Sequence, residues 1–341
     1  MPSEKPIAFR NLGPKLLAAL LALFGLVTLF GCQGSPSILN PQSPGAADIS
    51  NLAWTLFFIA LPVFVVVEGL LVFAALRFRS RGEGEEPRQI EGHTPIEVLW
   101  TAAPGVVLII ILFLTFQSMA VVLETPPDSM RIEVVGHQFW WEARYPDDNF
   151  VTANEIHVPV GRSVRVDLSS VDVIHSFWVP ELGGKVDMVP GHRNQTTFRA
   201  VKIGTYRGQC AEFCGLDHAY MGFLTMADSP REYEAWVRNQ QQPAARPTTP
   251  EAMQGEAAFL TAGCAGCHAI VGTNARGVLG PNLTHIGSRQ TIGANLLANN
   301  PENMARWLAD PQALKPGNLM PNLRLDSTTI GQLVAYLESL K

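Results

Sequence analysis

Two cysteines, two histidines and a methionine form the most informative pattern in this sequence. Cys210 and Cys214 are separated by three residues, His218 and Met221 follow shortly after them, and His175 lies farther upstream. Thiolate and thioether sulfurs select copper, and imidazole nitrogens also bind it. One metal ion cannot use all five groups, so the set predicts a centre of two copper ions bridged by the two thiolates.

The remaining ligands of this predicted centre come from the same loop and from His175 upstream of it. His175 and His218 are expected to bind one copper each through nitrogen. Met221 is expected as a weak axial ligand of one ion, and the backbone carbonyl of Glu212 as a ligand of the other. When one electron is shared by two bridged ions, bond lengths change little on reduction. The expected chemistry is therefore fast electron transfer at low driving force.

Two other interpretations of the cysteine pair stay open. Cys210 and Cys214 could form a disulfide, as exported cysteines often do, but a structural bridge has no use for the flanking histidines and methionine. A single blue-copper ion would need one cysteine, two histidines and a methionine, which leaves the second cysteine unexplained.

A second motif, Cys264-Ala-Gly-Cys267-His268, is typical of covalent haem attachment. It supplies two thiols for haem c and His268 as the proximal iron ligand.

The second axial ligand of this haem is predicted to be Met320. It follows Pro316-Gly317 and precedes Pro321, so it lies in a segment that cannot be regular helix. Methionine ligation raises the potential of a cytochrome c. Met304 falls in a predicted helix and is expected in the core, and His285 is the remaining alternative.

The N-terminus has the features of a signal peptide, assigned here to residues 1–31. Three basic residues precede an apolar run from Leu16 to Phe30 that ends at Gly31-Cys32. A small residue before a cysteine resembles the bacterial lipoprotein box, so Cys32 is the expected site of lipidation. The alternative is an uncleaved first helix with an incidental cysteine. With Cys32 assigned, no cysteine of the five is left over.

Residues 32–125 are expected to form a transmembrane hairpin. Its spans, at about 52–76 and 98–123, are each long enough to cross a hydrocarbon core of roughly 30 Å. The connection between them is rich in arginine close to the membrane ends, which places it in the cytoplasm and everything after Leu123 outside. Glu68 lies within the first span, so we expect it to face another membrane subunit or a polar cavity; snorkelling at the interface is the alternative.

Residues 126–228 change to short strands separated by Gly and Pro. Three segments read as strands before the copper loop, Arg131–Val135, Val164–Leu168 and Thr197–Val201, and Gly222–Met226 reads as the closing strand. The pattern predicts an all-β Greek-key sandwich or barrel. With the predicted copper ligands, such a domain is cupredoxin-like. His175 is expected on one loop and Cys210 to Met221 on a neighbouring one.

A short helix and linker, residues 229–249, lead to an all-α domain at 250–341. Ser229-Pro230-Arg231-Glu232 has capping-box spacing, and a Gln, Ala and Pro-rich tether from 240 to 250 would reach roughly 30 Å if extended. Three helices are expected beyond it, one after Thr249-Pro250, one from Asn300-Pro301 to before Pro311, and one after Asp326. Such small helices gain their core by wrapping a haem, as in a class I cytochrome c domain.

Composition sets the broader class. The chain has 341 residues, 47% of them hydrophobic, and a formal charge of −5 without a basic stripe. The apolar fraction is high for a soluble protein and agrees with the membrane spans. The mild negative charge gives no indication of a nucleic-acid partner.

Together these residues resemble a known family. The segments His175-Ser-Phe-Trp-Val-Pro, Lys185-Val-Asp187 and Pro190-Gly191, with the copper loop and the hairpin before them, are similar to subunit II of haem-copper cytochrome c oxidases. The C-terminal cytochrome makes the chain resemble the cytochrome-fused, caa-type variant. The resemblance covers nearly the whole mature chain.

The resemblance implies further residue roles. The carboxylate of Glu212 would face subunit I and bind a magnesium ion there. Glu97 matches the acidic residue at the mouth of a proton-uptake path, although a Glu near a helix N-terminus is also favoured by the macrodipole. Phe139, Trp140 and Trp141 match the electron-input segment, but the family usually has Trp where this chain has Phe139. That input point is therefore in doubt, and Trp140 and Trp141 can equally be core aromatics.

The expected function is that of the electron-accepting subunit of a proton-translocating cytochrome c oxidase. Electrons would pass from a cytochrome or a quinol-cytochrome c reductase complex to haem c, then to the copper pair, then to subunit I, which reduces oxygen. Subunit III is a further expected partner, and the location is the bacterial inner membrane with the copper and haem domains in the periplasm.

Three rival classes differ in what they require. A nitric oxide reductase with a similar copper subunit is the alternative function. A nitrous oxide reductase needs a histidine-rich copper cluster that this chain of eight histidines lacks. A copper-storage protein has no use for haem c.

Overall fold

The computed structural model describes residues 36–79 and 91–341. The predicted signal peptide, Cys32 and two arginines of the predicted cytoplasmic connection, Arg81 and Arg88, lie outside these residues. Arg77 and Arg79 lie within them, at and just after the end of the first long helix.

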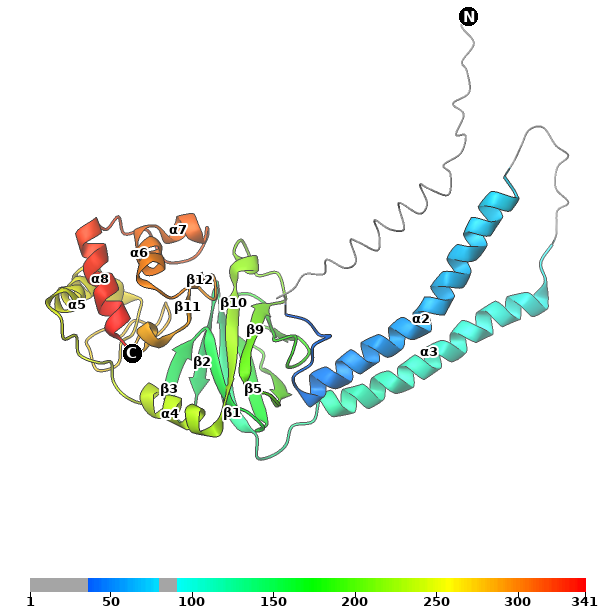
Figure 1. Cartoon of the computed structure of the whole chain (residues 1–341), viewed down its shortest axis with the longest axis horizontal. Helices are drawn as coiled ribbons and strands as arrows, with labels where there is room; N and C mark the ends of the chain where they lie inside the picture. Colours follow the sequence, from blue (N-terminus) through cyan, green and yellow to red (C-terminus); the bar gives the residue numbers. More distant parts are fainter. Residues whose placement is uncertain (1–35, 80–90) are drawn as a thin grey trace, which may run out of the picture. The chain divides into compact units, whose positions relative to one another are not determined.

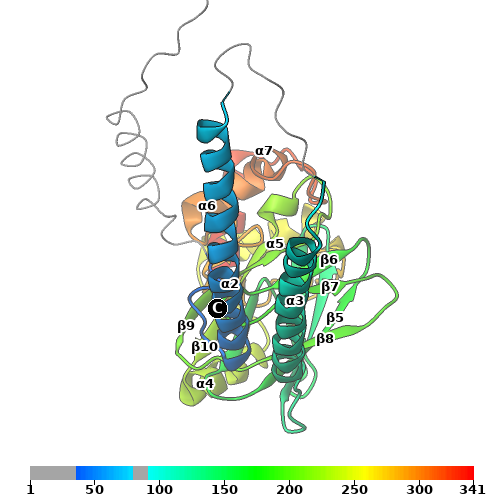
Figure 2. The same cartoon turned by 90° about the vertical axis from the view of Figure 1, so that its right-hand side faces the viewer.

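Two long apolar helices, α2 (Pro44–Arg77) and α3 (Thr94–Val122), form the N-terminal part of the described chain and run side by side (Figure 1, Figure 2). Both are long and apolar enough to cross a membrane, and almost none of their surface is buried within the chain. α2 begins eight residues before the predicted span, because Ser43 caps it by accepting the backbone N–H of Ala46 and Pro44 occupies its first turn.

Polar contacts hold the hairpin to the β domain at both of its ends. Before α2, the Ser43 hydroxyl donates to the Leu182 carbonyl at 2.6 Å, and the Gln42 N–H donates to the Glu181 carbonyl at 2.7 Å. After α3, the Thr125 and Thr197 hydroxyls are 2.8 Å apart. The β domain is therefore attached to the hairpin at two separate places.

The β domain is a sandwich of two five-stranded sheets. One sheet has the order β3-β2-β1-β5-β8 and the other β4-β10-β9-β6-β7. The strands are β1 (Met130–His137), β2 (Trp140–Tyr145), β3 (Phe150–Ala153), β4 (Glu155–Pro159), β5 (Val164–Ser170), β6 (His175–Trp178), β7 (Val186–Met188), β8 (Asn194–Phe198), β9 (Gly204–Cys210) and β10 (Gly222–Asp228).

Buried and half-buried side chains alternate along the strands, which explains why the two sheets pack face to face. In β5, Val164, Val166, Leu168 and Ser170 are buried while the residues between them are only half-buried. β1 pairs with β5 in parallel, with Ile132 opposite Val166, and both side chains enter the single core between the sheets. The predicted all-β domain is thus confirmed.

Two local predictions in this domain were wrong. The strand predicted at Thr197–Val201 is β8, which begins three residues earlier and ends at Phe198 because its pairing with β5 ends there, at Val164. His175 lies at the start of strand β6 rather than on a loop, since it pairs with Met188 of β7.

α4 (Pro230–Gln240) follows the sandwich. Its capping box is complete, because the Ser229 hydroxyl accepts the N–H of Glu232 and the Glu232 carboxylate accepts the N–H of Ser229. The segment after it is less free than the predicted tether. The Ala244 N–H donates to the Val271 carbonyl at 2.9 Å, and Gln242 O lies 3.2 Å from His285 Nε2.

The C-terminal domain is helical, as predicted, and contains α5 (Pro250–Thr261), α6 (Pro301–Ala309), α7 (Pro311–Leu314) and α8 (Ser327–Ser339). Thr249, Asn300 and Asp326 cap the first, second and fourth of these helices. α5 and α8 cross closely at Gly255, where an added Cβ would lie 2.0 Å from the Gln332 carbonyl oxygen. Only glycine allows that approach.

Candidate copper and haem sites

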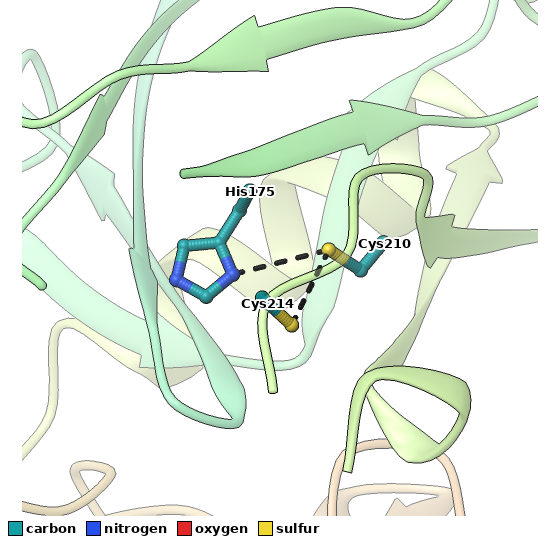
Figure 3. A group of neighbouring side chains, drawn as sticks. All are labelled: His175, Cys210 and Cys214. Atoms are coloured by element: carbon teal, nitrogen blue, oxygen red, sulfur yellow. Dashed lines mark hydrogen bonds between the residues drawn. The ribbon is translucent and has the colours of Figure 1, made fainter. Parts of the chain in front are cut away.

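The two thiols of the copper loop lie together with His175, as Figure 3 shows. Cys210 Sγ is 3.8 Å from Cys214 Sγ and 3.8 Å from His175 Nδ1. His218 Nδ1 lies 3.7 Å from Cys214 Sγ, on the other side of the pair. Each sulfur therefore has the other sulfur and one imidazole nitrogen as neighbours.

The two remaining predicted ligands contact the same sulfurs. The Met221 thioether sulfur is 3.8 Å from Cys214 Sγ, and the Glu212 carbonyl oxygen is 3.2 Å from Cys210 Sγ. The structure thus gathers all six predicted copper-site residues into one cluster, with the sulfur pair at its centre.

Asp172 orients the His175 ring by contacting the ring nitrogen that does not face the cysteine sulfurs. Its carboxylate is 2.8 Å from His175 Nε2, which leaves Nδ1 directed at the cysteine sulfurs. Burial lowers the pKa of His175, but the hydrogen bonds to Cys210 and Asp172 outweigh it and raise the pKa above its usual value. A carboxylate behind a histidine is the arrangement that fixes the tautomer of metal-binding imidazoles.

The hydrogen bond between the two thiols shifts their pKa values in opposite directions, because each thiol ionises more easily when the other keeps its proton. It lowers the pKa of Cys210 to about 3 and raises the pKa of Cys214 above that of a free thiol. A cation between the sulfurs would relieve this competition, because both groups could then be thiolates.

Three hydrogen bonds hold the copper loop, two of them between backbone groups and one from the side chain of Gln138. The Cys210 N–H donates to the Met221 carbonyl at 3.0 Å, which closes the loop on itself. The Ala211 N–H donates to the Ser176 carbonyl at 3.0 Å, and the Gln138 amide donates to the Cys214 carbonyl at 2.6 Å. The ligand atoms are therefore positioned by the sandwich before any metal binds.

The C-terminal domain contains an apolar cavity of about 320 Å³. Cys264, Cys267, His268 and Met320 line this cavity. The other lining residues include apolar side chains of the C-terminal core: Phe259, Leu283, Ile286, Ile292, Met304, Trp307, Leu308, Leu333 and Leu337.

His268 is prepared to bind iron through one nitrogen. Its Nδ1 lies 2.8 Å from the Pro281 carbonyl and donates to it, so Nε2 is free for a ligand. Burial lowers its pKa and keeps the ring neutral, as metal binding requires. Gly280 leaves room beside the ring, because a Cβ there would lie 2.5 Å from His268 Cε1.

The three candidates for the second axial ligand occupy different places. Met320 lies in the irregular segment between α7 and α8 and lines the cavity. Met304 is on α6, lines the same cavity and is more deeply buried. His285 does not line the cavity, and its Nε2 lies beside the Gln242 carbonyl.

A half-buried arginine adds to the fit of this cavity for a haem. Arg289 lines the cavity and donates to the Asn282 carbonyl at 2.6 Å, and its buried Nε has no hydrogen-bond partner among the described residues. An apolar cavity with two thiols, a neutral histidine and an unpaired cationic donor suits a covalently attached, anionic macrocycle.

The three aromatic residues of the predicted input segment have different environments. Trp141 is a core residue against Phe177 and Phe223, so that alternative holds for it. Phe139 and Trp140 instead line the apolar cavity described above, and Trp140 stacks on His137 with ring centroids 4.1 Å apart.

Glu212 and Glu97 lie far apart in the fold. Glu212 is half-buried beside the sulfur pair, and its carboxylate has no hydrogen-bond partner among the described residues. Glu97 lies in the first turn of α3, where its carboxylate accepts the His93 N–H at 2.9 Å. That contact is the helix-terminus role considered as the alternative.

Several residues that contact these sites were not among the residues predicted from the sequence. Asp172 precedes His175 by three positions, a local signal that could have been followed. Gln138, which directly follows strand β1, donates to the copper loop. Lys315 and Glu155 are buried polar residues far from the copper loop in the sequence. No local pattern marks them.

Family models match three stretches of the chain. Residues 37–118 match the transmembrane domain of cytochrome c oxidase subunit II, residues 149–227 match its periplasmic domain, and residues 252–341 match cytochrome c. Cytochrome c oxidase subunit 2 of Alkalihalophilus pseudofirmus is 38% identical over 327 residues, with 92% of this chain and 95% of that protein covered. The chain belongs to the cytochrome c oxidase subunit II family.

A second relative agrees with this assignment. Cytochrome c oxidase subunit 2 of Bacillus subtilis is 33% identical and covers 95% of this chain and 97% of its own length. The crystal structure of the periplasmic domain of subunit II from Bradyrhizobium japonicum is 34% identical, with a TM-score of 0.34, 35% of this chain and 97% of that chain covered.

Membership of the subunit II family carries several consequences. The chain is anchored in a membrane by its two helices and has extramembrane copper and cytochrome c domains. Copper of the CuA type and haem c are implied as its cofactors, and the oxygen-reducing subunit I as its partner. The oxidase assignment takes precedence over the nitric oxide reductase alternative.

Proposed function

We propose that this chain, as the electron-accepting subunit of an oxidase, receives electrons in residues 250–341 and delivers them through residues 126–228 to subunit I. The observation that supports this most strongly is the presence of two prepared sites on one chain. One is the sulfur pair with an imidazole nitrogen on each side, and the other is the apolar cavity with His268 and two thiols.

The proposed copper residues divide into three kinds. Cys210 and Cys214 would bridge two copper ions, and His175 and His218 would supply one nitrogen each. Met221 and the Glu212 carbonyl would be the weak ligands. A mixed-valence copper pair and a haem c supply reversible one-electron chemistry when bound, while the protein holds the ligands in place and excludes water from the buried sulfurs.

The proposed haem residues are Cys264 and Cys267 for covalent attachment, with His268 and Met320 as axial ligands. The free Nε2 of His268 and the position of Met320 on the cavity wall support this assignment. The neutral, buried ring of His268 needs no deprotonation to bind iron.

Three further roles concern the oxidase around this chain. The unpaired carboxylate of Glu212 would bind magnesium at the contact with subunit I. Subunit III is a proposed additional partner, and the electron donor is a cytochrome or quinol-cytochrome c reductase complex. Glu68 is exposed on α2 among apolar residues and would face one of the membrane subunits.

The proposed location is the bacterial inner membrane, with the copper and haem domains in the periplasm. The arginines that follow α2 support this orientation, because positive residues favour the cytoplasmic side. Cys32 would be lipidated after removal of residues 1–31. Mass spectrometry of the mature protein should then find a diacylated Cys32 as its first residue, and an intact Met1 would contradict it.

Glu97 is proposed at the mouth of a proton path into subunit I. Its contact with the His93 N–H also explains the residue by helix capping alone. Replacing Glu97 by Gln separates the two roles, since Gln keeps an acceptor for that N–H but cannot carry a proton. Slower proton uptake with unchanged thermal stability would support the path, and an unchanged proton-uptake rate would contradict it.

The experiment that tests the proposed function compares two substrates on the purified complex. Oxygen consumption driven by a reduced cytochrome should be rapid, and nitric oxide consumption under the same conditions should be negligible. Metal analysis of the same sample should give two copper ions and one haem c per chain. Faster consumption of nitric oxide than of oxygen would replace the oxidase by the reductase.

A further inference from the structure

Two buried charged side chains, one from each domain, form hydrogen bonds between the copper domain and the cytochrome domain. Lys315 belongs to the segment after α7 and is only 2% exposed. Its Nζ donates to the carbonyls of Phe139 and Tyr220, both at 2.8 Å, and to that of Gly293 at 3.1 Å. Two of these carbonyls belong to the copper domain and one to the cytochrome domain.

Glu155 makes the reciprocal connection from the copper domain. It begins β4, is 4% exposed, and accepts the backbone N–H groups of Gln290 and Thr291 at 2.8 and 2.9 Å. The Thr291 hydroxyl is 3.2 Å from the same oxygen. Desolvation raises the pKa of Glu155, and the buried charge of Arg289 opposes that rise.

Charges buried to this degree are unfavourable unless hydrogen bonds replace their water. The three carbonyls do so for Lys315, and three donors do so for Glu155. Burial lowers the pKa of Lys315 to about 8, with the nearby Asp217 opposing the shift, so the ammonium group is still charged near neutral pH. Neither side chain is among the proposed copper or haem ligands, so the cofactors do not account for them.

The groups that Lys315 joins lie next to both sites. Tyr220 directly precedes Met221, and Gly293 lines the haem cavity. Phe139 and Trp140 line that cavity as well, and Trp140 packs against Ala294 of the cytochrome domain. The backbone N–H of Gly222, on the copper side, donates to the Ala294 carbonyl at 3.1 Å.

We infer that Lys315 and Glu155 are positioning residues that lock the cytochrome domain onto the copper domain over the Phe139–Trp140 segment. This inference rests on the proposed function and specifies the route by which electrons enter the copper domain. With the lock closed, an external donor cannot reach Phe139 or Trp140, which are 7% and 9% exposed. Electrons then enter the copper domain only from this chain's own haem c.

The lock is tested by hydrogen-deuterium exchange on the whole purified complex. The variants are Lys315→Met, which keeps the aliphatic length but removes the donor, and Glu155→Gln, which keeps the shape but removes the charge. Lys202→Met, on the exposed surface of the copper domain, is the matched control. Peptides covering residues 136–142 and 290–296 should exchange on the order of tenfold faster in Lys315→Met, with a smaller rise in Glu155→Gln and none in the control.

A second readout follows the order of reduction after rapid mixing with a reduced soluble cytochrome c. In the unaltered complex, haem c should be reduced before copper. In Lys315→Met, part of the copper should be reduced without a preceding haem phase, because the Phe139–Trp140 segment has become accessible. Copper and haem spectra recorded on each variant identify any sample that has lost its cofactors.

The outcomes separate the lock from the proposed function. Unchanged exchange in both peptides for both variants, with intact copper and haem spectra, would overturn the lock and leave the proposed function standing. Absence of a two-copper signal in the unaltered protein would overturn the proposed function itself. If Lys315→Met does not fold, the Glu155→Gln exchange alone decides, since that variant changes one atom of the contact.

Discussion

At the scale of single residues, the copper cluster depends on competition between two sulfurs for one proton. Cys210 and Cys214 are 3.8 Å apart, and their pKa values move in opposite directions because only one of them can ionise without a cation. Metal binding is favoured because it allows both to ionise. A bound cation would therefore remove the electrostatic cost of placing two thiolates this close together.

Replacing Cys214 by Ser tests the bridging role. A hydroxyl does not replace a thiolate bridge, so the two-copper mixed-valence signal in electron paramagnetic resonance should disappear and the copper content should fall. Ser176→Ala is a useful control, because its buried hydroxyl adjoins the site but has no hydrogen-bond partner among the described residues. Two coppers and an unchanged spectrum in Cys214→Ser would refute the assignment.

Replacing Met320 by Ala tests the second haem ligand. The haem should stay attached through its two thioether bonds, but the midpoint potential should fall because the sulfur ligand is lost. Redox titration of the haem absorbance measures this. Met253→Ala, at an exposed position of α5, should leave the potential unchanged. A fall in potential with Met304→Ala instead of Met320→Ala would assign the ligand to α6.

The residues found from the sequence differ in kind from those that were missed. Short spacings mark the residues of the copper loop and of the haem-attachment motif, whereas His175 and Met320 lie farther away in the sequence and were predicted from their residue type and their surroundings. Lys315 and Glu155 are marked by nothing local, since their partners are backbone groups 22 to 176 residues away. Only the fold shows that these charges are buried.

At the scale of elements, the crossing of α5 and α8 supports the haem cavity. Gly255→Ala should destabilise the cytochrome domain by about 1–3 kcal/mol, because the new methyl group overlaps the Gln332 carbonyl and backbone must move. Denaturant titration followed at the haem absorbance measures the free energy of unfolding. Gly331→Ala is the matched control on α8, where the nearest atom is 3.7 Å from the new Cβ, and it should be stabilising by about 0.5–1 kcal/mol. Equal effects of the two changes would contradict the crossing.

The observed bounds show which ends of helices and strands can be predicted from the sequence. The helices after Thr249, Asn300 and Asp326 begin where predicted, because a capping side chain, in two cases followed by proline, marks a helix start locally. Strand ends depend on partners instead. β8 ends where β5 begins, and His175 is a strand residue because Met188 pairs with it. The residues next to β8 and to His175 in the sequence do not indicate which strand pairs with them.

At the scale of the whole molecule, electron transfer between the two domains should be intramolecular. Residues 241–249 keep the cytochrome domain at an effective concentration of the order of millimolar even without the docking contacts. Flash reduction of haem c should therefore be followed by copper reduction at a rate that does not depend on enzyme concentration. A rate proportional to concentration would show exchange between molecules.

Removing residues 250–341 supplies the complementary test. The shortened complex should consume oxygen only when a soluble cytochrome is added, and less efficiently than the full chain, because Phe139 stands where the family usually has Trp. Stopped-flow reduction of the copper signal checks this directly. Oxygen consumption without any added cytochrome would show another donor route.

The double attachment of the β domain to its membrane hairpin limits how that domain can move. A body held at one flexible point can rotate about three axes, whereas a body held at two points keeps only rotation about the line that joins them. The contacts of residues 42–43 with Glu181 and Leu182, and of Thr125 with Thr197, are two such points. The copper loop therefore has a narrower range of orientations toward a membrane neighbour than it would have on a domain attached by one flexible linker.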